Sequence, residues 1–599
     1  MTKLISRRHL SFILDEVIDV ARLCRLPRFA EHDRASFSAS LDMAEALAIE
    51  ELLPSYALLD REEPRLVAGR VVLPAATARS INAMRALGLF GMYAAPAVGG
   101  LGLPRTIANA ALLWLQAANV SIANYLLLTS SAAELLAVHG SIEQKRRYMQ
   151  PMLEGRFLGT MALSEPQAGS SLGDITTRAR LRADGRYALS GSKMWISGGE
   201  HDLAETIVHL MLARVEGAPA GVKGISLFIV PRDRLDAEGR PCGANHIAVA
   251  GLNHKMGQRG TVNCALEIGD GGETIGEIVG APGQGLAQMF TMMNEARIGV
   301  SLGAVAHASA GFLHALAYAR DRRQGRHPDQ KDPDAPPVAI IEHADVRRML
   351  LDQKAAAEGG IALGLDLAML ADLKAAAETA AERADAGLLL ELLTPVFKAW
   401  ISDEMLAASS SSMQVLGGAG YTRDHPLEQH YRDNRLNPIH EGTNGIQAID
   451  LVGRKLGLGG GRALALLIER IGATISGARS HAALADAASG LAEATRMLAE
   501  TAARLREIGR TRGSAAMLAP AHHLLDLVGE VVFVWTWLRQ AEVAARALPA
   551  AEGPDRDFYA GKIAVLGHVA RHRLPRIAHL GRLALDPGSY LDLSSDCFD

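Results

Sequence analysis

Cysteine is scarce in this chain, and its few cysteines lie far apart. The 599 residues contain Cys24, Cys242, Cys264 and Cys597, and no two of them form a CxxC pair. We therefore expect neither a disulfide framework nor a structural zinc site, and the usage favours a reducing cytoplasm. The first residues, MTKLISRRHLSFILDEV, carry charges where a signal peptide needs an apolar core, so we do not expect export.

The chain also lacks an excess of charge of one sign. Its formal net charge is −4, and 49% of its residues are hydrophobic against 21% charged, which indicates a globular protein. The segment after residue 456 contains 16 Lys and Arg against 15 Asp and Glu. This balance gives no reason to expect nucleic acid as a partner, because such partners select a basic surface.

Sequence motifs of several common enzyme classes are missing. We find no HExxH and no Walker loop, which argues against a metalloprotease and an NTPase. No GxGxxG follows a predicted strand, so a Rossmann nicotinamide site has no support, and we expect no metal site. The glycine cluster in 456–462 also follows no strand, and we predict a linker there.

One uncharged run is long enough to cross a bilayer. Residues 106–133 carry no formal charge. They nevertheless include Asn109, Gln116, Asn119 and Asn124, whose polar groups are costly in lipid. We therefore predict a pair of buried helices and no integral membrane segment, while peripheral attachment to a membrane stays open.

The apolar pattern changes twice along the chain. Up to about residue 155 it has helical spacing, and from about 160 to 270 short β-rich runs alternate with Gly, Asp and Pro. No helix-length crossover separates these runs, so we expect an antiparallel sheet or barrel. Long helices return from Gly283 to about 456, interrupted by a surface loop at 327–337, and an Ala-rich helical block follows.

Two segments of the β-rich region combine an aromatic ring with hydroxyl groups. Residues 161–179 (MALSEPQAGSSLGDITTRA) carry Ser164 and Ser170, and residues 193–199 (KMWISGG) carry Trp195 and Ser197. Such groups suit a heteroaromatic ligand with donors and acceptors on its rim, although a core Trp and turn serines would look the same.

A lone carboxylate stands before a predicted helix in NPIHEGTNGIQ, residues 437–447. Glu441 precedes Gly442, and the helix starts a few residues later. An acid at a helix N-terminus can serve simply to stabilise the helix dipole.

Taken together, four motifs resemble the acyl-CoA dehydrogenase family: ALSEPQAGSS, KMWISGG, QVLGGAGY (414–421) and IHEGTNGIQ occur in that order, and the resemblance covers about 40–456. The N-terminal segment and the helices after 460 look like a larger bacterial subgroup with a C-terminal helical extension. The resemblance implies a mainly α fold with a central β domain. Its expected parts are an N-terminal helical domain (1–158), an antiparallel β domain for flavin and substrate (159–280), a four-helix-bundle domain (281–456) and an extra C-terminal helical domain (460–599).

The resemblance also implies the reaction. Glu441 matches the catalytic base that removes the α-proton of a saturated acyl-CoA, while the β-hydrogen leaves as hydride to N5 of FAD and gives a trans-2-enoyl-CoA. The backbone N–H of the base residue and a flavin ribityl hydroxyl hold the thioester oxygen, and Gly442 allows the peptide to approach closely. Electrons then pass to an electron-transferring flavoprotein.

Further residues match family positions that contact the cofactor or substrate. Leu163, Ser164 and Ser197 would meet the flavin rim, and Trp195 would shield one flavin face. Ser170 and Arg297 would contact or position CoA, and Thr443 and Gln447 would lie near the FAD adenosine. The positions that hold the FAD pyrophosphate across a subunit contact match Arg322, Gln414, Gly417 and Gly418. Three positions depart from the common family pattern, namely Asn294, Gln324–Gly325 and His440.

The resemblance leaves several points open. An acyl-CoA oxidase, which passes electrons to oxygen, is a close variant, and a DNA-binding flavoprotein of the same fold is a second alternative. The acyl group could be 3-methylmercaptopropionyl, medium-chain or long-chain. We expect a homodimer, because the extension covers the surface that shorter relatives use to form tetramers. The apolar run VVFVWTWL (531–538) is predicted to pack against the dehydrogenase core or a sister subunit.

Overall fold

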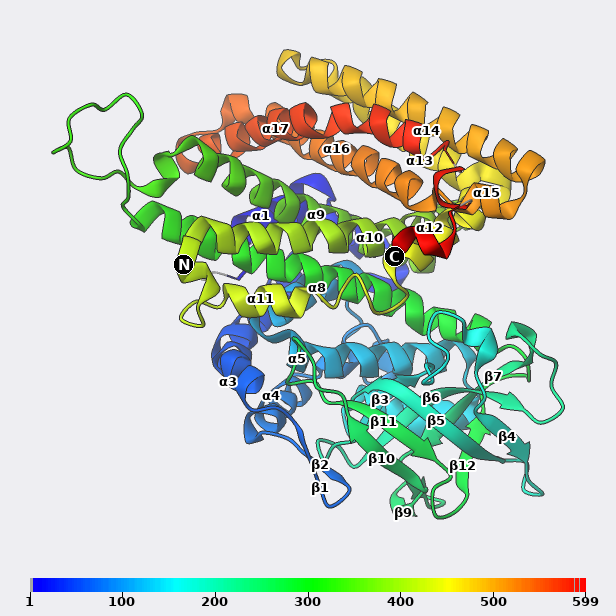
Figure 1. Ribbon diagram of the computed structural model, residues 1–599. Helices are drawn as coiled ribbons and strands as arrows, with labels where there is room; N and C mark the ends of the chain where they lie inside the picture. Colours follow the sequence, from blue (N-terminus) through cyan, green and yellow to red (C-terminus); the bar gives the residue numbers. More distant parts are fainter. Residues whose placement is uncertain (1–3, 587, 592) are drawn as a thin grey trace. The chain divides into compact units, whose positions relative to one another are not determined.

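The computed structural model describes residues 4–586, 588–591 and 593–599 (Figure 1). These residues divide into two compact units: Ala35–Gly299, called the β unit here, and the residues up to Arg34 with Val300–Asp599, called the helical unit. The predicted division at 158, 280 and 460 gave no sign that the first 34 residues pack with the C-terminal helices. Residues 1–3, 587 and 592 of the predicted end domains lie outside the described residues.

The β unit contains one long buried helix that is broken in the middle. Helix α5 (Arg105–His139) has extended dihedral angles at Asn119, with φ −162° and ψ 92°. The side-chain oxygen of Asn119 accepts the Ile122 N–H, and its amide donates to the Ser55 hydroxyl at 2.9 Å. The predicted pair of buried helices is therefore confirmed, with Asn119 at the break.

Among the described residues, two helices are long and apolar enough to span a membrane, α5 and α8 (Gly285–Asp321). The most apolar stretch of α5 is 89% buried inside the protein, as expected for a core helix. Length and composition alone are weak evidence for a membrane span, because core helices share both properties.

The core of the β unit is an eight-stranded sheet with the order β10-β11-β5-β12-β7-β6-β3, and β4 pairs with both β5 and β6 (Figure 1). Most pairs are antiparallel as predicted, but β3 and β4 both pair with β6 in parallel. No sequence pattern indicates these parallel pairs, because strands rather than a crossover helix connect them: β4 and β5 lie between β3 and β6 in the chain, and β5 lies between β4 and β6. The strands are β3 (Phe157–Ala162), β4 (Arg178–Leu181), β5 (Tyr187–Ser197), β6 (Thr206–Val215), β7 (Ile225–Pro231), β10 (Ile247–Leu252), β11 (Asn263–Ile268) and β12 (Thr274–Ile278).

Long helices build the helical unit. Helix α9 (Ala344–Ala376) packs against α10 (Ala380–Leu416), which also contacts α11 (Leu427–Asn434) and α12 (Asn444–Gly453). The C-terminal part of α8, from Val300, belongs to the same unit. The predicted loop at 327–337 is largely exposed between α8 and α9.

The C-terminal extension packs on the helices that precede it. It consists mainly of α13 (Arg462–Ala478), α14 (Ala485–Arg512), α16 (Ala521–Ala547) and α17 (Gly553–Leu583). The Trp537 indole N–H donates to the Ala355 carbonyl at 3.1 Å, and the ring of Phe533 lies 5.1 Å from that of Trp400. The predicted packing of residues 531–538 against the core is thus confirmed.

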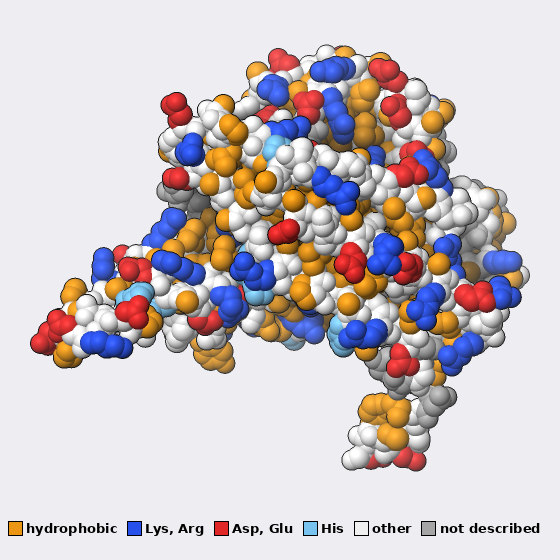
Figure 2. All heavy atoms as spheres, turned by 90° about the horizontal axis from the view of Figure 1, so that it is seen from above, with side chains coloured by type: hydrophobic (Ala, Val, Ile, Leu, Met, Phe, Trp, Pro, Cys, Tyr) orange, Lys and Arg blue, Asp and Glu red, His pale blue; other side chains and the backbone are white. Residues whose placement is uncertain are grey.

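The N-terminal segment joins the same unit through α17. The ring centroids of Phe12 and Phe558 lie 5.3 Å apart, and Arg8 pairs with Asp555 at 3.0 Å. On the face shown in Figure 2, basic and acidic side chains are interspersed, without a large field of one sign.

Candidate active site

In the β unit, strand β5 bulges at Trp195. Lys193 pairs with Leu266 and Ile196 with Cys264, so Met194 and Trp195 together lie opposite a single residue of β11. Trp195 adopts φ +65°, and its side chain is 63% exposed. A left-handed conformation is strained for a bulky residue, and strand bulges often re-aim a side chain beside a functional site. The bulge therefore presents a flat indole to whatever binds there.

The loop that carries Ser164 is fixed to the bulge. The Met194 N–H donates to the Ser164 carbonyl at 2.9 Å, next to Trp195. Leu163 is buried in the core under this loop, and the side chains of Ser164 and Ser197 are half-buried. The four residues predicted to contact the flavin ring, Leu163, Ser164, Trp195 and Ser197, are thus carried by one loop and one strand that are hydrogen-bonded to each other.

A buried ion pair anchors this loop, and no sequence motif indicated it. Glu165 and Lys193 pair at 2.9 Å with both side chains almost fully buried, and Lys193 also donates to the Leu163 carbonyl at 3.0 Å. Glu165 further accepts the backbone N–H and the hydroxyl of both Thr176 and Thr177.

The pKa values of this pair reflect opposing effects. Burial raises the pKa of Glu165, but the Lys193 ammonium and the threonine hydrogen bonds outweigh burial and hold that pKa at about 2. Burial lowers the pKa of Lys193 to about 8 even though Glu165 favours its charged form. Both groups are therefore charged at neutral pH.

The two predicted CoA-contacting residues of the β unit differ in their surroundings. Ser170 is exposed on the loop beyond Glu165. Arg297, in α8, is buried, donates to the Asn294 side chain at 3.3 Å and lies over the Phe290 ring. The departure at Asn294 thus gives Arg297 a neutral neighbour at this position.

In the helical unit, Glu441 lies in a strained turn before α12. Glu441 and Gly442 both have positive φ, +56° and +85°. The Gln447 amide donates to the carbonyls of both residues, at 3.2 and 3.4 Å, and Thr443 caps α12 by accepting the Ile446 N–H. Positive φ at a non-glycine residue is uncommon and concentrates at functional sites.

A buried lysine fixes this turn to α10. Lys398, fully buried, donates to the Asn444 side-chain oxygen at 3.1 Å, and the Asn444 amide donates to the Ala399 carbonyl. No sequence motif indicated a role for these two residues. His440 bonds to Asn437, and burial, with the nearby charge of Lys398, lowers its pKa to about 3, so this histidine is neutral at neutral pH.

The four residues matched to pyrophosphate binding lie at one end of the helical unit. Arg322 follows α8 and Gln414 lies near the end of α10, and residues of both helix ends share one hydrophobic cluster. Arg322, Gln414, Gly417 and Gly418 are all exposed. Gly417 needs its φ of +60°, and a Cβ at either glycine would meet no atom within 4 Å, so a ligand can approach this backbone closely.

Matches to known sequences cover nearly the whole chain. Family models match for the acyl-CoA dehydrogenase N-terminal domain at 37–156, the middle domain at 160–270 and the C-terminal domain at 283–456. An "acetyl-CoA dehydrogenase C-terminal like" model matches 467–591. The chain is 37% identical to 3-methylmercaptopropionyl-CoA dehydrogenase of Ruegeria pomeroyi over 93% of both chains. It is 34% identical to the broad-specificity linear acyl-CoA dehydrogenase FadE5 of Mycobacterium tuberculosis over 94% of both.

A solved structure agrees on the fold. The acyl-CoA dehydrogenase of Bacillus anthracis, complexed with FAD, is 20% identical, has a TM-score of 0.74, and the match covers 96% of this chain and 91% of the other. The helical, β and helical order, matched domain by domain by the family models, is that of a flavin-dependent oxidoreductase. The chain belongs to the acyl-CoA dehydrogenase family.

Members of this family use FAD, and the residues of this chain fit that cofactor. Trp195 offers an exposed aromatic face, and Ser164 and Ser197 offer hydroxyls close to it. The Gln447 Oε1 atom is buried and has no hydrogen-bond partner among the described residues, which is the state expected of a group that awaits a ligand donor.

Proposed function

We propose that this protein oxidises an acyl-CoA thioester to a trans-2-enoyl-CoA, with Glu441 as the base that removes the α-proton. The observation that carries this proposal is the turn at Glu441, where a carboxylate is held at positive φ by Gln447 and by the Asn444–Lys398 contact. A carboxylate at an ordinary helix start needs no such support. FAD, when bound, supplies the acceptor for the β-hydride.

The residues of the chain then divide the work. Glu441 accepts the α-proton. Its backbone N–H, next to Gly442, donates to the thioester oxygen as negative charge develops on that oxygen. Trp195, Ser164 and Ser197 bind the flavin ring and exclude water from it. Arg322, Gln414, Gly417 and Gly418 bind the FAD pyrophosphate, since a guanidinium fork and open backbone suit phosphate oxygens. Thr443 and Gln447 bind the adenosine portion, and Ser170 and Arg297 bind CoA.

The acyl group is the finer part of the proposal. The two relatives described above are named for 3-methylmercaptopropionyl-CoA and for linear acyl-CoAs. We propose that the substrate is one of these two classes. The test is a panel of thioesters from butyryl-CoA to stearoyl-CoA, with 3-methylmercaptopropionyl-CoA, scored by loss of the flavin absorbance without oxygen. A protein that keeps its flavin but is reduced by no member of the panel would contradict the proposal.

The electron acceptor and the assembly complete the proposal. An electron-transferring flavoprotein would take the electrons, and a homodimer in the cytoplasm, where the four free cysteines stay reduced, would be the working form. Slow reoxidation of the reduced protein in air supports the dehydrogenase. Fast reoxidation with peroxide would show an oxidase instead, and sedimentation of a monomer would contradict the dimer.

A further inference from the structure

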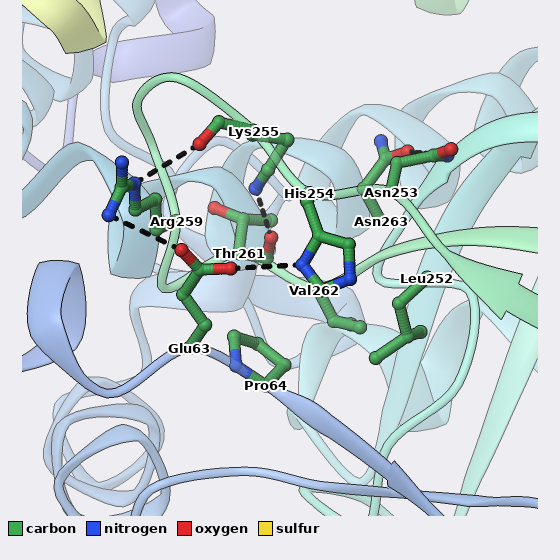
Figure 3. Close-up of a pocket in the computed structure, with 10 residues that line it drawn as sticks. All are labelled: Glu63, Pro64, Leu252, Asn253, His254, Lys255, Arg259, Thr261, Val262 and Asn263. Atoms are coloured by element: carbon green, nitrogen blue, oxygen red, sulfur yellow. Dashed lines mark hydrogen bonds and ion pairs between the residues drawn. The ribbon is translucent and has the colours of Figure 1, made fainter.

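The segment from Asn253 to Asn263, called the strap here, connects β10 with β11 and lines a small pocket with Glu63 and Pro64 (Figure 3). Its turn closes on itself, because the Lys255 ammonium donates to the carbonyls of Gln258 and Thr261, each at 2.5 Å. Arg259 pairs with Glu63 at 3.3 Å from the same turn. The strap is therefore a defined structure rather than a loose loop.

The strap is also fixed to the broken helix α5, close to its break. The Thr261 hydroxyl donates to the Ser121 carbonyl at 2.7 Å, and the Val262 N–H donates to the Tyr125 hydroxyl at 3.1 Å. The Asn124 amide donates to the side chains of Gln258 and Thr261. These contacts determine where the last residue of the strap, Asn263, enters β11.

A chain of side-chain hydrogen bonds runs from the strap to Ser197. The Asn253 amide donates to the Asn263 side-chain oxygen at 2.7 Å, and the Asn263 amide donates to the Ser197 hydroxyl oxygen at 3.0 Å. Figure 3 shows the two asparagine side chains next to each other. The backbones are already joined, since the Asn253 N–H donates to the Asn263 carbonyl at 2.9 Å, so the side-chain contacts are not needed to pair the strands.

The direction of these bonds has a chemical consequence. Because Asn253 occupies the oxygen of Asn263, the amino side of that amide faces Ser197 and can only donate. The Ser197 oxygen then acts as an acceptor toward Asn263, and its single proton is left to point elsewhere. Ser197 lies two residues after the exposed Trp195, at the end of β5.

We propose that Asn253 and Asn263 are positioning residues that make Ser197 a hydrogen-bond donor toward the flavin ring. This inference rests on the proposed function only through the flavin. A donor to a carbonyl oxygen of the ring stabilises the electron-rich reduced form more than the oxidised form, so the two asparagines would raise the tendency of the flavin to accept electrons.

The experiment measures the flavin midpoint potential and visible spectrum of the FAD-loaded protein without substrate. Asn263→Leu removes the donor to Ser197 at similar volume, and Asn263→Asp replaces it with an acceptor that captures the Ser197 proton. Both should lower the potential, and the loss of one hydrogen bond corresponds to roughly a twofold to tenfold change in the reduction equilibrium. Asn253→Leu should act in the same direction and less strongly.

A double variant separates positioning from general damage. In a Ser197→Ala background, Asn263→Leu should leave the potential and spectrum unchanged, because its effect passes through the missing hydroxyl. Asn245→Ala is the matched control: this buried asparagine bonds to Pro231 and Ile275 in the same sheet. It should lower the unfolding temperature without shifting the potential.

The outcomes distinguish a failure of the positioning role from a failure of the proposed function. An Asn263→Leu shift that persists without the Ser197 hydroxyl, or an equal potential in all variants of a protein that still oxidises acyl-CoA, would overturn the inference alone. A protein that takes up no flavin would overturn both the inference and the proposed function.

Discussion

Trp195 in the β unit and Glu441 in the helical unit have similar backbone conformations but are stabilised by different interactions. Each is a non-glycine residue at positive φ, and each lies beside a segment fixed by a fully buried lysine. Lys193 neutralises a buried carboxylate, Glu165, whereas Lys398 donates to a neutral amide, Asn444. A buried ion pair is costly to break, because loss of the lysine leaves the carboxylate buried without its cation, whereas a hydrogen bond to a neutral amide is worth less. Loss of Lys193 should therefore destabilise the protein more than loss of Lys398.

The largest expected effect lies in the helical unit. Glu441→Gln should slow flavin reduction by acyl-CoA by about a hundredfold to ten-thousandfold, because a general base contributes roughly that factor. FAD content and thioester binding should remain. The measurement is stopped-flow loss of flavin absorbance, with Asp450→Asn as the control, because this carboxylate of α12 pairs with Arg454. Normal turnover by Glu441→Gln would show that another group is the base.

The anchor in the β unit comes next. Lys193→Met leaves Glu165 buried without its cation and should lower the free energy of unfolding by about 3–5 kcal/mol, measured by denaturant titration. The control is Arg146→Met, which removes the cation of the exposed pair with Glu143 and should leave stability unchanged. Equal stability of both variants would show that the anchor is unimportant.

The same pair predicts a pH dependence that the lysine–amide anchor does not. Since the folded pKa of Glu165 is depressed from 4.5 to about 2, its contribution to stability is complete above about pH 4.5 and is lost as the pH falls toward 2. Glu165→Gln should flatten this part of the profile of unfolding free energy against pH. A variant that keeps the full slope would assign the acid sensitivity to other carboxylates.

A smaller loss is expected from Lys398→Met, about 1–3 kcal/mol, the range for one hydrogen bond to a charged donor. The rate of flavin reduction should fall as well, because Asn444 and the turn at Glu441 lose a support. If this variant lost as much unfolding free energy as Lys193→Met, the difference between the two anchors would disappear.

The smallest effect concerns the backbone at Trp195. The free energy of unfolding of Trp195→Gly should be about 1 kcal/mol higher than that of Trp195→Ala, because only glycine adopts this φ without strain. Both variants should bind FAD more weakly than the natural protein, which isothermal titration of the apoprotein can measure. Alanine equal to glycine in stability would mean that the bulge relaxes when the indole is lost.

The motifs pointed to Trp195 and Glu441, but they predicted neither the positive φ of these residues nor the side chains that hold them in place. Periodicity gave the helical, β and helical order, and four short motifs brought Trp195 and Glu441 into view. The partners of Glu165 lie 11, 12 and 28 residues away, and Lys398 and Asn444 are 46 residues apart. Single lysines and asparagines of this kind carry no local pattern, because their role appears only when distant strands and helices pack.

The parallel strands and the first 34 residues escaped prediction for a related reason. Residue type decides that a segment is a strand or helix, but the choice of partner depends on the packing of the whole unit. Nothing in the residues around Phe12 indicates that α17 will cover them.

The contact of Phe12 with Phe558 sets the order in which the protein can be completed. The residues around Phe12 reach their native contacts only after α17 has been made, more than five hundred residues later along the chain. The helical unit therefore cannot complete its folding until α17 has been synthesised, and a truncation that removes α17 would expose the residues around Phe12.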